Sequence, residues 1–452
     1  MVCTVLVLFM NLPGLQLFYG GMVNSKNMVS VFLTCTAVQC ICTLVWFAVG
    51  YSLVFSTGGS PFLGGLERVL MNGITPAGPL VAPGVPEALF AVFHSTYAAI
   101  TPCVIIGAYV GRMKFSASVA FCVAWMLAVY VPFARMVWGG GFLHQVGLID
   151  FAGGVVIHVT AGVSALVAAH VIGPRKRFLS GEVGPGHNLV AIMAGTGIIW
   201  TAWLGFNGGS VPTGVSTEAA WVFLTTMAAA ASGGIAWMLA DALAPVEPHG
   251  HGGSNGGSVP GGPNKISALG ACLGIVAGLV CITPAALFVS PWAAVFMGAV
   301  AAVACRAACA WLRKTAHARS SDDACEVFGL HGTGGILGNA LTAVFAATTF
   351  GGTREVHNVL AQFALHNAAA LAACLWAGSC TWAILKALDA TLPGGIRVAA
   401  ATEEEGLDFA EHGEEAYAFV SDVAAAAIAA AKPPPPAAVT VVTPTKDLTL
   451  LA

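Results

Sequence analysis

Residues 150–173 read DFAGGVVIHVTAGVSALVAAHVIG, and this stretch decides the fold class. After the first aspartate it contains no lysine, arginine or acidic residue. It is long enough to cross a hydrocarbon layer of about 30 Å, which takes about 20 apolar residues. His158 lies near its middle, where ionisable groups are costly and usually serve a pathway or a partner. The stretch therefore predicts a membrane-spanning helix with a functional residue at mid-depth.

The composition of the whole chain supports this prediction. Of its 452 residues, 57% are hydrophobic and only 9% are charged, whereas soluble domains carry about 25% charged residues. So small a charged fraction excludes a soluble enzyme, a disordered protein and a nucleic-acid binder. The sequence predicts an all-α polytopic membrane protein. Its eleven predicted transmembrane helices lie at 2–22, 29–55, 86–111, 116–138, 150–173, 187–207, 217–242, 266–283, 289–312, 326–348 and 358–388.

Lysine and arginine are unequally distributed between the connections of these spans. The odd-numbered connections hold ten of them, and the even-numbered ones hold two, Arg68 and Arg354. Because cytoplasmic loops are enriched in positive charge, the odd-numbered connections and the C-terminus are predicted to be cytoplasmic and the N-terminus outside. The ten are Lys26, Arg112, Lys114, Arg175, Lys176, Arg177, Lys265, Arg313, Lys314 and Arg319.

Two short motifs recur at an offset of five spans. HVTAGV begins at His158 and recurs as HGTGGI at His331, and FYGG begins at Phe18 and recurs as FNGG at Phe206. An odd number of spans reverses the direction of the chain, so this offset describes an inverted repeat. Transporters of this construction place their sites near the midplane, where the repeats meet. We predict an inverted 5+5 repeat plus one extra helix, with His158 and His331 meeting near the membrane centre.

A buried histidine pair has definite chemical properties. Each neutral imidazole has one donor and one acceptor nitrogen, so two rings can bond to each other and still serve a small polar guest. The alternative is that both are core histidines satisfied by internal hydrogen bonds. Asp150 precedes His158 by eight residues, about 12 Å along a helix, so we expect it to cap the helix start rather than touch the ring. No carboxylate accompanies the pair at metal-ligand spacing, and no metal or other cofactor is expected.

Aromatic residues gather near the outer ends of several predicted spans. They are Phe93, Tyr97, Trp138, Trp203 and Phe206. One interpretation is an interfacial aromatic belt. The other is a vestibule that attracts a small cation through ring faces, at about 0.5–2 kcal/mol per face, with Ser210 as a hydroxyl acceptor. Periodicity alone leaves both open.

Six stretches together resemble the ammonium transporter / methylammonium permease / Rhesus family. They are LPGLQLFYGGMVNSKN (12–27), MVWGGG (136–141), DFAGGVVIHVTAG (150–162), WLGFNGGS (203–210), ISALGACLGIVAGLVCITPA (266–285) and EVFGLHGTGGILG (326–338). The resemblance extends from residue 1 to about 420 and includes GLDFAEHGEEAY at 406–417. It implies a homotrimer with one pore in each subunit.

The resemblance also implies roles for individual residues. By this resemblance, the family's outer ammonium site corresponds to Trp138, Tyr97 and Ser210, with Asp150 supporting it. Its gate corresponds to Tyr97 and Phe206, with Phe93 and Trp203 nearby. Its pore corresponds to His158, His331, Val327 and Thr283. Tyr97 stands where many members have phenylalanine, and Glu326 stands where aspartate is usual. Retention of Trp138 favours the ammonium transporter branch over Rhesus-type gas channels.

These features predict an ammonium transporter of the plasma membrane. It would recruit NH4+ at the outer cation–π site, deprotonate it, and conduct NH3, with or without the proton, past the paired histidines. A passive NH3 or CO2 channel, and an ammonium sensor that signals through its cytoplasmic tail, are the alternatives. An enzyme is not expected, because the sequence presents no nucleophile–base pair. The expected partners are ammonium or methylammonium, the lipid bilayer and further copies of the chain.

The membrane domain is predicted to occupy residues 1–390. A cytoplasmic regulatory segment follows at 391–422, and a disordered tail at 423–452. The acidic stretch 403–417 is expected to dock on basic connections at Arg175, Lys176, Arg177, Arg313, Lys314 and Arg319. Its partner would be a P-II-like protein or a kinase. A flexible loop is predicted at 245–265.

Overall fold

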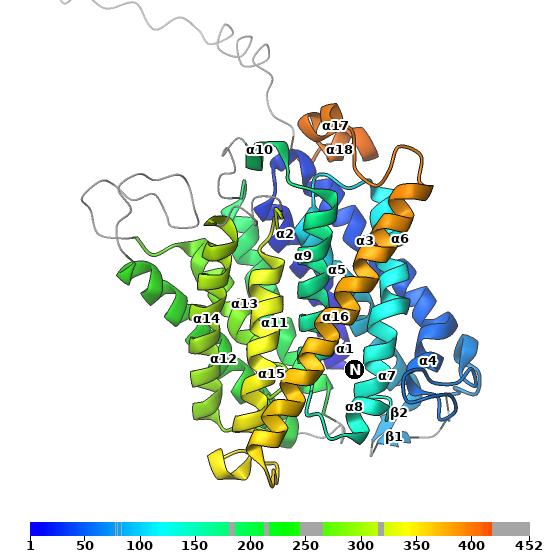
Figure 1. Cartoon of the computed structure of the whole chain (residues 1–452), viewed down its shortest axis with the longest axis vertical. Helices are drawn as coiled ribbons and strands as arrows, with labels where there is room; N and C mark the ends of the chain where they lie inside the picture. The colour runs from blue at the N-terminus through cyan, green and yellow to red at the C-terminus, as the bar shows by residue number, and fades with distance from the viewer. Residues whose placement is uncertain are drawn as a thin grey trace, which may run out of the picture.

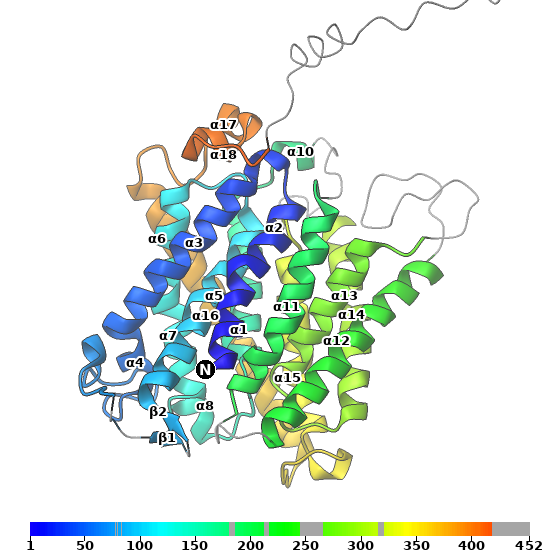
Figure 2. The same cartoon turned by 180° about the vertical axis from the view of Figure 1, so that it is seen from behind.

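The computed structural model describes residues 1–76, 78, 80–82, 84–179, 186–211, 217–244, 265–314 and 321–417. The predicted tail at 423–452 lies outside these residues, as does the predicted loop at 245–265 apart from Lys265. Within the described residues the chain is a bundle of long helices that run side by side (Figures 1 and 2).

The helices and strands have the following bounds. They are α1 (Val2–Phe9), η1 (Met10–Leu15), α2 (Gln16–Met22), η2 (Ser25–Asn27), α3 (Met28–Val45), η3 (Trp46–Gly50), α4 (Tyr51–Phe55), η4 (Val69–Met71), β1 (Leu80–Ala82), β2 (Val85–Pro86), α5 (Glu87–Tyr109), α6 (Phe115–Trp125), η5 (Met126–Tyr130), α7 (Val131–Val137), α8 (Phe142–Gln145), η6 (Gly154–Val159), α9 (Thr160–Ile172), α10 (Lys176–Leu179), α11 (Leu189–Gly209), α12 (Thr217–Leu243), α13 (Ala268–Ile282), α14 (Pro291–Lys314), η8 (Phe328–Gly332), α15 (Thr333–Phe345), η9 (Thr348–Phe350), α16 (Val359–Thr391), α17 (Ala400–Glu405) and α18 (Leu407–His412). The strands β1 and β2 form a short antiparallel hairpin.

In the described part of the chain, nine helical segments are long and apolar enough to cross a membrane. They are Val2–Met22, Ser25–Phe55, Glu87–Tyr109, Phe115–Gln145, Gly154–Ile172, Leu189–Gly209, Thr217–Leu243, Pro291–Lys314 and Val359–Thr391. The other two predicted spans are also helical: the eighth is α13, a shorter apolar helix of 15 residues, and the tenth is η8 with α15. The prediction of a helical, multi-pass membrane protein is confirmed.

Small residues allow α12, α13 and α14 to pack closely. A Cβ atom added to Gly274 of α13 would lie 2.6 Å from the carbonyl oxygen of Gly233 of α12. A Cβ on Gly298 of α14 would lie 2.3 Å or less from the backbone oxygen of Ala229 and the hydroxyl of Ser232, both of α12. Close backbone approach is the usual basis of helix association in lipid, so the glycine content of this chain serves packing here.

An ion-pair cluster joins three loops at the end of the bundle where α10, α17 and α18 lie, called the tail face below (Figure 1). Asp322 accepts hydrogen bonds from the Arg175 side chain at 2.6 and 2.8 Å and lies 3.9 Å from the guanidinium of the fully buried Arg112. Burial opposes ionisation of this carboxyl, but the charges of Arg175 and Arg112 hold the pKa of Asp322 below its usual value. Arg313 pairs separately with Glu326 at 2.5 Å. The cluster therefore fixes the loops after α5 and α9 to the segment that begins η8.

Residues 391–417, called the tail segment below, dock on this face through backbone and side-chain contacts. The Asp408 carboxylate accepts a hydrogen bond from the backbone N–H of Ser30 at 2.7 Å, at the start of α3. The Asn27 side-chain oxygen accepts one from the N–H of Leu407 at 2.8 Å. Asp408 is 2% exposed. The helices α17 and α18 are thus held against the membrane domain of the same chain.

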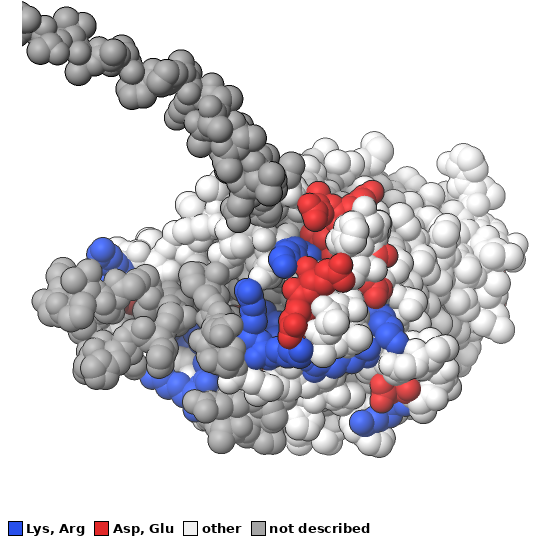
Figure 3. Space-filling model, turned by 90° about the horizontal axis from the view of Figure 1, so that it is seen from above, with Lys and Arg blue, Asp and Glu red and all other residues white. Residues whose placement is uncertain are grey.

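The predicted charge pairing between tail and connections is observed at Lys176. Lys176 pairs with Glu404 at 2.5 Å, and acidic side chains lie against basic ones on the tail face (Figure 3). Arg175 and Arg313, however, pair with acidic residues of the membrane domain. The reason is the fold, which brings the segment before η8 within ion-pair distance of both arginines. Arg319 lies outside the described residues.

Candidate functional site

The site begins where Asp150 caps the π-helical segment η6. One carboxylate oxygen accepts hydrogen bonds from the backbone N–H groups of Gly153 and Gly154 at 2.9 and 2.6 Å. The other accepts from Val155 and Val156 at 2.8 and 3.3 Å. The first N–H groups of a helix lack acceptors within the helix. The Asp150 carboxylate accepts hydrogen bonds from all four of these N–H groups. Asp150 therefore anchors the start of the helix that carries the first histidine, as the sequence predicts.

Asp323 plays the same part for η8 and was not identified from the sequence. Its two carboxylate oxygens accept hydrogen bonds from the N–H groups of Val327 and Phe328 at 2.9 and 2.7 Å. Asp323 precedes His331 by eight residues, the same spacing as Asp150 and His158. That repeated spacing is the signal that could have revealed it. Glu326, which the sequence analysis placed at this helix start, pairs with Arg313 instead.

The two histidines meet where these helices cross. Their Nδ1 atoms lie 3.2 Å apart. Glycines on both sides permit the contact: Gly162, four residues after His158, faces the backbone of Gly332, and Gly335, four residues after His331, faces His158. A Cβ atom on Gly335 would lie 2.9 Å from the Cβ of His158. This reciprocal arrangement is what two segments related by a local twofold axis would produce.

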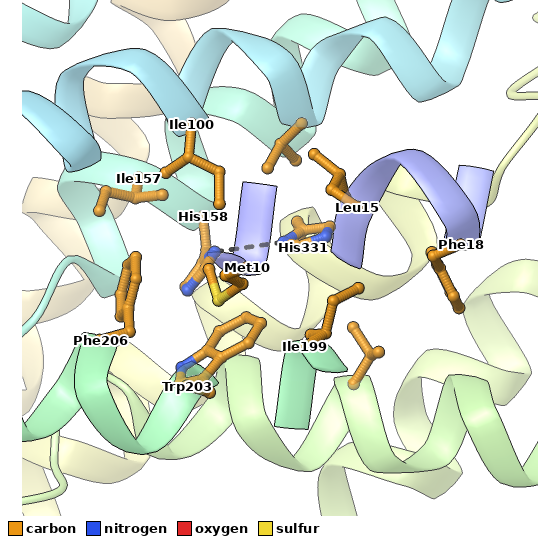
Figure 4. A pocket seen from close by; sticks show the side chains of 12 residues that line it. Met10, Leu15, Phe18, Ile100, Ile157, His158, Ile199, Trp203, Phe206 and His331 are labelled. Carbon is orange, nitrogen blue, oxygen red and sulfur yellow. Dashed lines mark hydrogen bonds between the residues drawn. The ribbon is translucent and has the colours of Figure 1, made fainter. Parts of the chain in front are cut away.

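The pair lines a small apolar cavity (Figure 4). Its volume of about 20 Å³ is enough for about one water-sized molecule. Figure 4 places Phe206 and Phe18 on opposite sides of the pair. The cavity is lined by Met10, Leu15, Phe18, Ile100, Val104, Ile157, His158, Ile199, Trp203, Phe206, Val276 and His331. It is therefore a narrow, apolar cavity with two imidazoles in its wall.

The hydrogen bond between the rings determines what they offer to a guest. Because one Nδ1 must donate and the other accept, one ring keeps a free acceptor at Nε2 and the other keeps an N–H donor there. Within the described residues, Nε2 of His158 is buried and has no hydrogen-bond partner. The pair can thus serve a small molecule that both donates and accepts hydrogen bonds.

Aromatic rings lie next to His158 along the candidate pathway. The indole of Trp203 stacks on the His158 ring with centroids 5.4 Å apart and an interplanar angle of 27°. Its Nε1–H donates to the hydroxyl of Thr283 at 2.9 Å, which fixes the orientation of the indole. Thr283 is not among the residues that line the cavity; it contacts Trp203, which is. Val327 is fully buried and is not among the residues that line the cavity.

Tyr97 and Phe206 form a stacked pair next along the passage. Their ring centroids are 4.2 Å apart at an interplanar angle of 27°, and Phe93 lies 4.9 Å from Tyr97. The Tyr97 hydroxyl donates to the backbone oxygen of Phe206 and lies 2.8 Å from the hydroxyl of Ser210. The Ser210 hydroxyl also donates to the backbone oxygen of Phe206 at 3.4 Å. Tyr97, Ser210 and Phe206 thus form one hydrogen-bonded group, in which the Ser210 oxygen keeps at least one free lone pair.

Trp138 forms the outer boundary of this aromatic group. Its ring centroid lies 5.8 Å from that of Tyr97, and its Nε1–H donates to the backbone oxygen of Asp150 at 3.1 Å. Asp150 therefore orients Trp138 through its backbone and η6 through its side chain. The structure brings the predicted outer-site residues into one group, with His94 as a further member that the sequence analysis left without a role. No cluster of three or more histidine, cysteine, aspartate or glutamate residues suited to a metal ion occurs in the described ranges.

Comparison with known proteins identifies the family. The model of the Ammonium Transporter Family matches residues 1–417. The chain belongs to the ammonium transporter family. It is 38% identical over 419 residues to an ammonium transporter of Aquifex aeolicus, covering 92% of each chain. Because its homologues are named transporters, the family points to a transporter rather than to an enzyme.

Solved structures agree with this assignment. The crystal structure of Candida albicans Mep2 superposes with a TM-score of 0.76 at 32% identity, covering 88% of this chain and 85% of that one. A structure named Sensor Amt Protein superposes with a TM-score of 0.79 at 26% identity, covering 91% and 96%. In this member of the ammonium transporter family, the passage from Trp138 to His331 is therefore the candidate pathway.

Proposed function

We propose that this protein transports ammonium across the plasma membrane. The observation that carries the proposal is the apolar cavity in which His158 and His331 hydrogen bond to each other, next to the stacked rings of Tyr97 and Phe206. Membership of the ammonium transporter family supports the choice of substrate. Methylammonium, which keeps three N–H donors, is expected as a second substrate.

Recruitment favours the cation at the outer site. The rings of Trp138 and Tyr97 attract a small cation, whereas neutral NH3 gains little from a ring face. Ser210 presents at least one free lone pair, because in the described residues its oxygen accepts at most the one hydrogen bond from Tyr97. Asp150 keeps the group in place through Trp138 and adds negative charge near the site. These contacts select NH4+ at the mouth of the pathway.

Passage favours the neutral molecule. An ion in an apolar cavity pays a large desolvation penalty, so NH4+ must lose its proton before it enters: NH4+ gives NH3 and H+. Ammonia can then accept from the donor nitrogen of the histidine pair and donate to the acceptor nitrogen. The released proton is taken up by water at the outer site and crosses separately, so each transported NH4+ carries one positive charge across the membrane.

The topology and assembly form part of the same proposal. The eleven helical segments cross the membrane, with the tail face in the cytoplasm and the N-terminus outside, as an inverted 5+5 repeat plus α16. The connections that contain Lys26, Lys114 and Lys176 are all predicted to be cytoplasmic. All three contact the tail segment, which supports their lying on the same side of the membrane. Three copies form a homotrimer with a pore in each subunit.

Current recordings test the proposed transport. Two-electrode recordings on cells that express the protein should show inward current with ammonium and methylammonium and none with potassium. His158→Ala and His331→Ala should each lower ammonium uptake about tenfold or more, equivalent to about 1.4 kcal/mol, at matched surface expression. Unchanged uptake and selectivity in both variants would refute the role of the pair.

Two alternatives give different results. A passive NH3 or CO2 channel would equilibrate ammonia without any current. A sensor is the second candidate, favoured by the similarity to the structure named Sensor Amt Protein. A sensor would bind ammonium and alter signalling through the tail segment while carrying little uptake.

A further inference from the structure

His94 occupies a defined place in the aromatic group at the outer site. It lies on α5, and its side chain is enclosed, with the residue only 8% exposed. The ring centroids of His94, Tyr97 and Trp138 form a nearly equilateral triangle, with separations of 5.6 Å from His94 to Trp138 and 5.8 Å for the other two pairs. The imidazole therefore contacts both rings that the proposed function assigns to cation recruitment.

The nitrogens of His94 have no hydrogen-bond partner among the described residues. Within the described ranges its Nδ1 is buried and has no hydrogen-bond partner, and no hydrogen bond to its Nε2 occurs there either. A neutral imidazole carries one donor and one acceptor nitrogen. Whichever tautomer is present, the acceptor is unoccupied.

Packing alone does not account for this residue. The rings of Phe55 and Phe90 lie 4.7 and 4.4 Å from the imidazole, so a phenylalanine at position 94 would meet the same apolar neighbours. A histidine there leaves buried polar atoms without partners, which costs free energy. The arrangement is better explained if a guest supplies the missing hydrogen bond.

We propose that His94 is a specificity-determining residue of the outer site. Its free acceptor nitrogen takes a hydrogen bond from an N–H of the ammonium ion held against Trp138 and Tyr97. This inference rests on the proposed function and adds to it the means of selection. Ring faces attract any small cation, whereas an acceptor distinguishes a cation with N–H donors from an alkali ion of similar size. His94 and Ser210 then supply two acceptors beside two ring faces.

Binding to the purified full-length protein tests the proposal without relying on transport. Isothermal titration with ammonium chloride and with rubidium chloride gives the affinity of a cation with N–H donors and of one without. His94→Phe keeps an aromatic ring and removes the acceptor, and His94→Gln restores an acceptor oxygen. Phe90→Leu is the matched control, because it alters a ring that packs on His94 and carries no hydrogen-bonding group.

The expected result is a change in the ratio of the two affinities. His94→Phe should weaken ammonium binding about tenfold and leave rubidium binding within about twofold. His94→Gln should recover most of the ammonium affinity, and Phe90→Leu should keep the wild-type ratio. If His94→Phe does not fold, His94→Met takes its place, since methionine fills irregular space and is only a weak acceptor.

The other outcomes are equally clear. An unchanged ratio in the phenylalanine variant, or a ratio in the glutamine variant as low as in the phenylalanine variant, overturns the assignment of His94. A wild-type protein that binds ammonium with the expected His94 dependence but carries no ammonium current overturns the transport proposal and supports His94. A wild-type protein that binds neither cation overturns both.

Discussion

Tyr97 combines two properties at the gate. Its ring stacks on Phe206 at 4.2 Å, and its hydroxyl bonds to the backbone oxygen of Phe206 and to Ser210. In the proposed function the ring face attracts a cation, while the hydroxyl joins α5 to the end of α11. The hydroxyl that distinguishes this residue from phenylalanine therefore stiffens the gate rather than lining the passage.

The outer site depends on ring faces more than on this hydroxyl. We expect Trp138→Leu to raise the ammonium concentration needed for half-maximal current several-fold, because loss of a ring face removes about 0.5–2 kcal/mol of cation–π attraction. Tyr97→Phe should change that concentration little and should lower stability by about 1 kcal/mol through the lost hydrogen bonds. Recording current as a function of ammonium concentration measures the first effect. Thermal unfolding in detergent measures the second. Unchanged current and saturation in Trp138→Leu would mean that the rings form only an interfacial belt.

Asp150 is an anchor before it is an electrostatic group. Asp150→Asn replaces one carboxylate oxygen with an NH2 donor that faces backbone N–H groups, so two of the four hydrogen bonds are lost. We expect thermal stability to fall by about 1–3 kcal/mol and ammonium transport to fall by more than this near-isosteric change would suggest. Uptake assays at matched expression and thermal unfolding are the measurements. Wild-type values for both would show that neither charge nor cap matters.

At the scale of elements, π-helical turns carry both histidines. His158 lies in η6 and His331 in η8, and each segment continues as an α-helix. Such turns are rare in proteins, and those that do occur are often found at functional sites. Here each begins at an aspartate that caps it, and each crosses the other at a glycine. Cap, turn and glycine together bring the two rings to 3.2 Å.

The glycine crossing gives a test of this geometry. A methyl group at Gly335 would lie 2.9 Å from the His158 Cβ and 3.0 Å from the Val159 nitrogen, so the two segments must separate. We expect Gly335→Ala to lower stability by about 1–3 kcal/mol, as overpacking does, and to reduce transport. Gly197→Ala on α11 is the control, because no atom lies within 4 Å of its added Cβ. Equal transport and unfolding temperature in the two variants would contradict the crossing.

At the scale of the molecule, the tail segment ties several helices together. Its hydrogen bonds reach the starts of α3 and α6 and the connections near Lys26 and Lys176. Tyr417, the last described residue, bonds to Asn188 at the start of α11 at 3.0 Å. Helices from both halves of the proposed repeat are thus held by one segment.

This arrangement predicts the effect of truncation. A chain that ends after Leu392 loses every contact of α17 and α18 and should lose most of its ammonium current. A chain that ends after Asp422 keeps those contacts and should retain it. Individual exposed pairs such as Lys176–Glu404 contribute only about 0–1 kcal/mol, so the segment must act as a unit. Equal currents from both truncations, at matched surface expression, would show that the tail does not regulate transport.

Sequence reasoning succeeded where the information is local. Hydropathy over about 20 residues reports whether a segment can enter lipid, and all eleven predicted segments coincide with helical stretches. The cap at Asp150 and the meeting of His158 with His331 follow from spacing and from an internal repeat. The same eight-residue spacing relates Asp323 to His331, but the sequence analysis did not apply it there.

Tertiary structure decided the contacts between distant segments. Which carboxylates the fold brings within reach decides that Arg175 pairs with Asp322 and Arg313 with Glu326. That the His94 ring lies 5.6 Å from the Trp138 ring depends on how α5 packs against α7. Composition and periodicity determined that this chain is a multi-pass helical membrane protein, because lipid acts on each segment separately. Which side chains share a cavity was decided only by packing, since that requires the positions of several helices at once.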